Sequence, residues 1–264
     1  MEQIGKIAII NVKELTKEKI KRLKKEARNL LKKPIETVLL KKEKVKGRLR
    51  KAQYIFLAGK KQFETFYKEN KCLFKLNVKE VYFSSKLASN RLWVAKKILE
   101  LSKAKKIKRP RILVMFCGIG VYGIVIARVL KDNGFDFDID MVEINRKAVG
   151  YAKQNVLLNK LENIKIFQGD VRKILPKLKK YDFVVMPRPK TSYDFFKESF
   201  MNVKKGSIVF YFDFIDESEI EIENKKLEEK AKKLGKKIKV LETKKAGQIG
   251  VRKYRVVCVF EVKN

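Results

Sequence analysis

From Arg111 onward, short apolar runs alternate with segments of helical periodicity, and this alternation constrains the fold more than any other feature. The runs RILVMF, FDFDIDMVEI, NIKIFQ, YDFVVM and GSIVFYFDF are predicted strands. Helices are predicted between them, beginning near residues 121, 146, 171 and 192. Repeated strand–helix units imply a parallel sheet with helices on both faces. The sequence therefore predicts a doubly wound α/β domain.

The C-terminal segment departs from this alternation. After a long charged helix predicted over about 218–234, the runs KIKVLET and YRVVCVFEV are joined by KKAGQIGVRK without a helix. Two strands with such a connection are expected to pair antiparallel. We therefore expect a terminal hairpin at one edge of the sheet.

The N-terminal third has a different pattern. The run GKIAIINV predicts a strand, the next segment predicts a basic helix, and ETVLL, AQYIFLAG, FETFY and CLFKLNV predict further strands. A helix over about 85–101 and the charged break KAKKIKRP then lead into the α/β part. The chain is predicted to have a small α+β domain over residues 1–84 and an α/β domain over residues 85–264.

The charge of the chain indicates its partners. With 65 Lys and Arg against 30 Asp and Glu, the formal net charge is +35. A field of this size attracts polyanions, and nucleic acid is the first partner to consider. The alternative is a lysine-rich composition that covers every surface alike. The lysines of the first helix and of KKEKVKGRLRK are expected to contact phosphates, in binding that weakens steeply with salt.

Two residue types limit the chemistry. Histidine is absent, which excludes histidine-dependent triads, H-E-x-x-H zinc sites and imidazole acid–base catalysis. Cys72, Cys117 and Cys258 are far apart and form no C-x-x-C pair, so neither a metal site nor a disulfide framework is expected. The sequence shows no secretory leader and no apolar run of membrane-spanning length. We expect a soluble, cytoplasmic protein.

A G-x-G-x-x-G pattern at Gly118, Gly120 and Gly123 lies between a predicted strand and a predicted helix. Such glycines allow close approach of the backbone to a nucleotide cofactor, and an acid about 20 residues later can bind ribose hydroxyls. Glu143 has this spacing. NAD and S-adenosylmethionine both contain that ribose, and glycines can also serve only to pack a helix on a strand. This pattern alone leaves the cofactor open.

The ends of the next two strands favour S-adenosylmethionine. Asp170 in IFQGDV can accept from an adenine amino group, and DFVVMPRP ends in a proline-stiffened loop suited to positioning a planar base. A dehydrogenase would instead need a proton-handling residue near the nicotinamide. The antiparallel terminal hairpin also suits the methyltransferase sheet. The predicted fold is therefore a Rossmann-like class I S-adenosylmethionine-dependent methyltransferase domain preceded by a small α+β domain.

A series of motifs then resembles one family over essentially the whole chain. GRLR, FLAG, ETFYKEN, YFSSKLASNR, FCGIGVYG, VEIN, GDV and MPRPK follow in order. They are similar to signatures of the archaeal and eukaryotic-type tRNA (guanine-37 N1)-methyltransferases and of the related aminocarboxypropyl transferases of wybutosine synthesis. The resemblance implies methyl transfer to guanine 37 of tRNA. The alternatives are aminocarboxypropyl transfer and a catalytically weakened RNA-binding homologue.

The resemblance also implies residue roles. Arg50 would contact guanine O6, Asn90 occupies the position of the proposed general base, and Pro189 lies in the loop beside the methyl group. Glu143 with Ile144 would bind the ribose. The full set of implied cofactor-binding residues is Tyr82, Phe83, Arg91, Phe116, Gly118, Gly120, Glu143, Ile144, Asp170, Val171, Met186 and Pro187.

Several positions depart from the family pattern. Asn90 replaces a glutamate, and an amide cannot accept the proton of guanine N1. Water, a substrate phosphate, Glu69 or Asp213 remain as proton acceptors. Ser85 replaces a proline and Tyr67 a histidine. The family's additional N-terminal tRNA-elbow domain has no counterpart, so recognition is expected to rest on the anticodon arm, with a monomer favoured.

Overall fold

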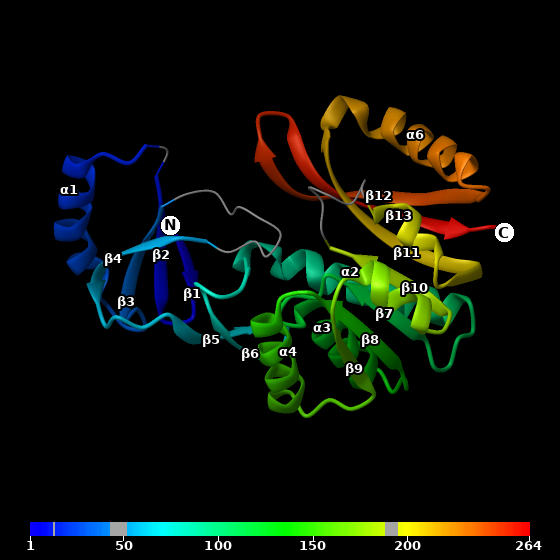
Figure 1. Ribbon diagram of the computed structural model, residues 1–264, viewed down its shortest axis with the longest axis horizontal. Coiled ribbons are helices and arrows are strands. Elements are labelled where there is room, and N and C mark those ends of the chain that lie inside the picture. The colour runs from blue at the N-terminus through cyan, green and yellow to red at the C-terminus, as the bar shows by residue number, and fades with distance from the viewer. Residues whose placement is uncertain (13, 43–51, 188–194) are drawn as a thin grey trace. The chain divides into compact units, whose positions relative to one another are not determined.

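The computed structural model of the protein describes residues 1–12, 14–42, 52–187 and 195–264 (Figure 1). Two compact units are present. The first consists of Met1–Ala88, Gly118–Val121 and Asn145–Lys160, and the second of Ser89–Cys117, Tyr122–Ile144 and Leu161–Asn264. The domain boundary after residue 84 stays a prediction.

The second unit is built on a seven-stranded sheet with the order β12-β13-β11-β10-β7-β8-β9. The strands from β9 to β11 in this order are parallel, whereas β13 pairs antiparallel with both β11 and β12. The predicted parallel sheet with an antiparallel terminal hairpin is thus confirmed. The strands are β7 (Arg111–Met115), β8 (Asp138–Glu143), β9 (Ile164–Gln168), β10 (Tyr181–Met186), β11 (Val203–Asp216), β12 (Ile238–Gly250) and β13 (Lys253–Val262).

One face of this sheet packs against α2 (Ala88–Ala104) and α3 (Val121–Asp132). The ring of Tyr122 meets Phe212 of β11 edge-on, with 5.5 Å between centroids. A Cβ on Gly123 would lie 2.4 Å from the sulfur of Met141 in β8. Gly123 is therefore required because α3 packs so closely against the strand.

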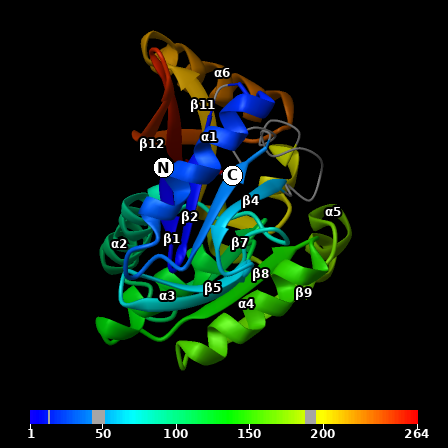
Figure 2. The ribbon, with the colours of Figure 1, turned by 90° about the vertical axis from the view of Figure 1, so that its left-hand side faces the viewer.

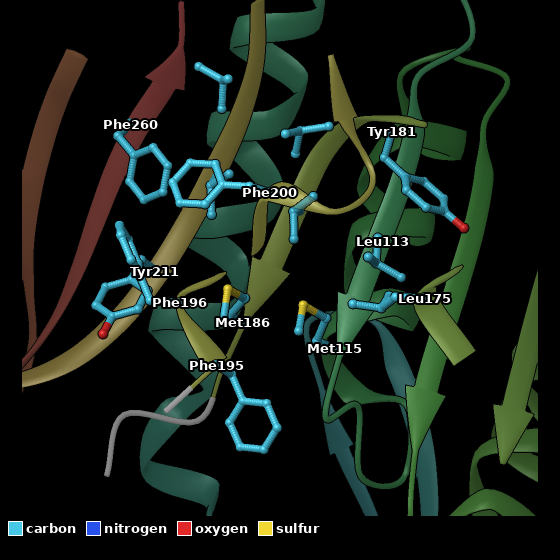
Figure 3. Close-up of a cluster of buried hydrophobic side chains, with 14 of the residues drawn as sticks. Leu113, Met115, Leu175, Tyr181, Met186, Phe195, Phe196, Phe200, Tyr211 and Phe260 are labelled. Atoms are coloured by element: carbon cyan, nitrogen blue, oxygen red, sulfur yellow. The ribbon is translucent and has the colours of Figure 1, made fainter. Parts of the chain in front are cut away.

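The opposite face is covered by α5 (Val171–Ile174), the 3-10 turn η6 (Lys197–Phe200) and α6 (Ile220–Lys233). Aromatic side chains fill this layer (Figure 3). The ring of Phe196 lies 5.1 Å from that of Phe200 and 5.5 Å from that of Tyr211, both edge-on. Edge-to-face contacts of this kind add to the stability from apolar burial.

The first unit contains a four-stranded sheet in the order β1-β2-β3-β4, formed by Glu2–Ile4, Ile7–Asn11, Thr37–Lys41 and Tyr54–Gly59. The helix α1 (Lys17–Ala27) lies in front of these strands in Figure 2. Its Leu23 and Ala27 are buried in a cluster with Ala8, Val38 and Leu40 of the sheet. The Thr16 hydroxyl accepts from the Lys19 amide and begins the helix. The turn η1 (Arg28–Leu30) ends it.

A hairpin of β5 (Glu64–Glu69) and β6 (Cys72–Asn77) belongs to the same unit, together with α4 (Arg146–Leu158). Asn155 exchanges hydrogen bonds with the backbone of Lys75 at 2.7 and 3.2 Å. Asn159 does the same with the backbone of Leu73 at 2.9 and 2.7 Å. The two side chains lie one helical turn apart and satisfy the edge of β6 as a neighbouring strand would.

Two sequence predictions were wrong in the described segments. The helix predicted to begin near residue 192 is only the turn η6 over its described part, and β11 already begins at Val203. The linker KKAGQIGVRK is mostly strand, because β12 continues to Gly250 and a two-residue turn leads to Lys253. None of the helices in the described segments is long enough and apolar enough to cross a membrane.

Candidate cofactor site

The glycine-rich loop leaves β7 through backbone conformations that favour glycine. Phe116, Gly118 and Gly120 have φ angles of 55°, 57° and 87°. The Phe116 ring contacts Phe195 edge-on at 4.9 Å, and the Cys117 amide donates to the Val142 carbonyl at 3.1 Å. The positive φ angles explain the glycines at two of these positions. The loop turns out of the sheet before α3 begins.

Asn155 of α4 also holds this loop. Its Nδ2 donates to the carbonyl of Ile119, between the two glycines, at 3.1 Å. Asn155 is fully buried. Sequence reasoning missed Asn155, because its role depends on a hydrogen bond to a residue 36 positions away along the chain.

The two predicted adenosine-binding carboxylates lie at the ends of neighbouring strands. Glu143 is the last residue of β8 and is paired in register with Gln168 of β9, and the Glu143 carbonyl accepts from the Gly169 amide at 2.9 Å. Asp170 follows directly and is the N-cap of α5, with one carboxylate oxygen accepting from the Arg172 amide at 2.9 Å. Both side chains are half-buried. Ligands of open α/β sheets bind at this carboxyl edge.

The apolar residues that the sequence predicts at the cofactor site differ in accessibility. Ile144 and Pro187 are half-buried. Val171 is 3% exposed, and Met186 is fully buried in the aromatic layer shown in Figure 3. Met186 can therefore meet a ligand only through its backbone. The predicted positions Arg50 and Pro189 lie outside the described residues.

Asn90 is buried near the start of α2, 4% exposed. Its Oδ1 accepts from the Tyr122 hydroxyl at 2.7 Å, which ties α2 to α3. Among the residues that the structure describes, Nδ2 of Asn90 has no acceptor. Arg91 is 3% exposed. The sequence placed Asn90 at the base position, but Tyr122, its partner, was not predicted.

In the first unit, Tyr82 and Phe83 are half-buried. The Phe83 ring lies 5.0 Å from that of Tyr67. The following turn η2 (Ser85–Leu87) is held by Glu2, whose Oε1 accepts from the Ser85 amide at 2.9 Å and from the Ser85 hydroxyl at 3.0 Å. The departure at Ser85 therefore provides two donors that a proline lacks.

Of the two acids left open as proton acceptors, Asp213 lies near the carboxyl end of β11. The last residue of β10, Met186, pairs with Tyr211 of β11, and Asp213 lies two residues after Tyr211 along β11. It lines a cavity of about 270 Å³ with residues of α6 that include Glu223 and Lys230. Burial raises the pKa of Asp213 to about 6, and the charge of Glu223 also raises it. Glu69 is buried in the β5–β6 hairpin.

Comparison with known proteins identifies the family. The TRM5/TYW2 methyltransferase domain matches residues 65–241. The tRNA (guanine(37)-N(1))-methyltransferase Trm5b of Pyrococcus abyssi is 28% identical over 98% of this chain and 73% of its own length. The Nanoarchaeum equitans tRNA (guanine(37)-N(1))/4-demethylwyosine(37)-methyltransferase Taw22 is 31% identical over 84% of this chain and 87% of its own length.

A solved structure agrees with these relatives. The complex of aTrm5 with tRNALeu superposes with a TM-score of 0.81 at 26% identity, covering 100% of this chain and 71% of that one. The family and fold predicted from the motifs are confirmed. The chain belongs to the TRM5/TYW2 methyltransferase family.

Proposed function

We propose that the protein transfers the methyl group of S-adenosylmethionine to N1 of guanine 37 in tRNA. The observation that carries the proposal is the placement of Glu143 and Asp170 at the ends of neighbouring parallel strands. In a chain of this family, that placement suits an adenosyl group. The names of the two relatives support the acceptor base.

The cofactor contacts follow from the strand ends. Glu143 accepts from the ribose hydroxyls, next to Ile144. Asp170 caps α5 and accepts from the adenine amino group beside Val171. Tyr82, Phe83 and Arg91 close over the cofactor, and Phe116, Gly118 and Gly120 line its approach.

When bound, S-adenosylmethionine supplies an electrophilic methyl group. The protein aligns guanine N1 in line with the carbon–sulfur bond, and this alignment provides much of the rate. Pro187 follows Met186, the last residue of β10, and the proline rings at positions 187 and 189 restrict the backbone beside the methyl group. Negative charge develops on O6 as N1 loses its proton, and the guanidinium of Arg50 stabilises that charge.

Asp213 accepts the N1 proton as the new carbon–nitrogen bond forms. A carboxylate with a pKa of about 6 is ionised at neutral pH and is basic enough for this role. Asn90 instead positions Tyr122. If so, Asp213→Asn lowers kcat and removes the limb near pH 6 from the pH–rate profile, while Glu69→Gln leaves that limb in place. An unchanged limb in Asp213→Asn excludes the assignment.

The acceptor is the anticodon arm of tRNA in the cytoplasm, where the target base must leave its stack to reach the cofactor. Residues 1–84 form the RNA-side domain and residues 85–264 the methyltransferase domain. The high positive charge of the protein provides the attraction for RNA.

The test compares methyl transfer from labelled cofactor to a guanine-37 transcript and to its adenine-37 counterpart. We expect label only in the first, and equal label in both rejects the proposal. Calorimetry with S-adenosylhomocysteine separates this function from a non-catalytic RNA-binding role, which predicts no cofactor binding. Glu143→Ala is expected to abolish that binding, and unchanged affinity rejects the cofactor assignment.

A further inference from the structure

Two long, solvent-exposed charged helices of this chain differ in how their charges are arranged. On α1 and the first residue after it, the exposed cations Lys17, Lys21, Lys24, Lys25 and Arg28 lie along one side. We call these five residues the α1 stripe. Four of them, Lys17, Lys21, Lys24 and Arg28, recur at intervals of four, three and four residues. That spacing puts them on one line along the helix, about 16 Å long at 1.5 Å per residue.

The other sides of α1 have different contents. Leu23 and Ala27 face the core, as described above. Glu26 lies on the flank away from the stripe and pairs with Arg22 at 2.9 Å, whereas Glu18 lies at the edge of the stripe, three residues before Lys21. Glu26 therefore lies apart from the α1 stripe, and Glu18 is the one acid of α1 beside it.

Within the described part of the chain, no member of the α1 stripe forms an ion pair. The ion pair of α1 joins Arg22 to Glu26 on the opposite flank. Like charges one turn apart repel each other and destabilise a helix. An arrangement that costs stability and has no ion-pair partner among the described residues is suited to an external anion.

The helix α6 shows that a lysine-rich composition alone does not require this segregation. Its lysines alternate with Glu221, Glu223, Glu228 and Glu229. Lys226 pairs with Glu223 at 2.6 Å, and Lys230 lies over the Phe196 ring at 4.8 Å. Both helices are exposed and rich in lysine, but only α1 separates its charges into a cationic line.

We infer that the α1 stripe binds the phosphate backbone of the double-stranded stem of the RNA substrate. The inference rests on the proposed function for the identity of the RNA. Lysine ammonium groups act as point charges that bind phosphates without reading sequence. The α1 stripe contains no aromatic side chain on which an unpaired base could stack. A straight cationic line of this length therefore suits the regular backbone of a stem.

The test replaces Lys17, Lys21 and Lys24 together by glutamine, which removes the charge, shortens each side chain by one atom and has a similar helix propensity. The matched control replaces three other exposed lysines by glutamine and changes the net charge by the same amount. These are Lys225 and Lys232 on α6 and Lys237 just after it. Far-ultraviolet circular dichroism and thermal unfolding check that both variants fold. The dissociation constant for a tRNA transcript is then measured from low to high salt.

Removing one cation that neutralises a duplex phosphate changes the slope of log affinity against log salt by about 0.9. We expect the slope of the stripe variant to fall by about 2 to 3, with a higher KM for tRNA and unchanged kcat. The control variant is expected to shift the slope by less than about 1. Equal slopes for the two variants overturn the inference.

Two further arms separate the possible failures. An isolated anticodon stem-loop should show the slope difference, and a single-stranded RNA of equal length should not; a difference of equal size on both overturns the assignment to a stem. S-adenosylhomocysteine affinity should be the same in both variants. If the wild type binds tRNA through the α1 stripe but forms no methylated guanine, the proposed function fails and this inference stands.

Discussion

Asn155 joins the cofactor loop to the rest of its unit, so its replacement tests the structure and the function together. Its side chain is fully buried and makes hydrogen bonds to the Lys75 amide, the Lys75 carbonyl and the Ile119 carbonyl at 2.7, 3.2 and 3.1 Å. Asn155→Ala removes these bonds and leaves the partly buried Lys75 amide and the buried Ile119 carbonyl without this partner. Each such group costs about 1–3 kcal/mol.

We therefore expect Asn155→Ala to lower the free energy of unfolding by about 3–5 kcal/mol, which is above the usual range of about 0.5–3 kcal/mol for single substitutions. The freed Ile119 carbonyl also loosens the loop between Gly118 and Gly120, so S-adenosylhomocysteine should bind more weakly. Urea denaturation followed by circular dichroism measures the first effect, and calorimetry measures the second under conditions where the variant is folded.

Asn133→Ala is the matched control. This asparagine also donates to a backbone carbonyl, that of Val129 at 2.8 Å, but it is exposed. Its replacement should cost less than about 0.5 kcal/mol and leave cofactor binding unchanged. A cost below about 1 kcal/mol for Asn155→Ala, or unchanged cofactor affinity, refutes the reasoning that Asn155 holds the loop.

Three further predictions concern stability. In the folded protein the pKa of Asp213 is about 6, above the ordinary value of 3.8. The stability that the protonated carboxyl group contributes is therefore fully present below pH 3.8 and is lost as the pH rises through 6. The free energy of unfolding of Asp213→Asn, measured by urea denaturation, should therefore rise relative to that of the wild type by on the order of 2 kcal/mol between pH 4 and pH 7. A difference between the two proteins that does not change with pH contradicts this. Gly150→Ala should raise the unfolding free energy by about 0.5–1 kcal/mol, because the residue is exposed inside α4 and an added Cβ meets no atom; a lower midpoint would show a hidden clash. Glu2→Ala should cost about 1 kcal/mol by freeing the Ser85 amide, seen as a lower melting temperature, and Gln3→Ala on the same strand should cost less.

The parallel sheet could be predicted because each strand leaves a local signal. Buried parallel strands are continuous apolar runs, and the loop after β7 needs glycines for its positive φ angles. The same reasoning located Glu143 and Asp170, since the carboxyl ends of parallel strands share one edge. These features depend on residues within a few positions of one another.

Other features depend on distant partners and could not be predicted. The segment before β11 has helical spacing, but its described part forms only the 3-10 turn η6, and Phe196 and Phe200 pack against each other in the aromatic layer. The bonds from Asn155 to Lys75 and from Ser85 to Glu2 join residues 80 and 83 positions apart. Asp213 gains its raised pKa from burial near α6, which a strand pattern does not reveal.

The most direct test of the central claim is nucleoside mass spectrometry of guanine-37 tRNA after incubation with the protein and S-adenosylmethionine labelled in its methyl group. Methyl transfer to N1 predicts a single labelled product, 1-methylguanosine at position 37. An aminocarboxypropyl adduct without the methyl label, or no modified nucleoside at all, would contradict it.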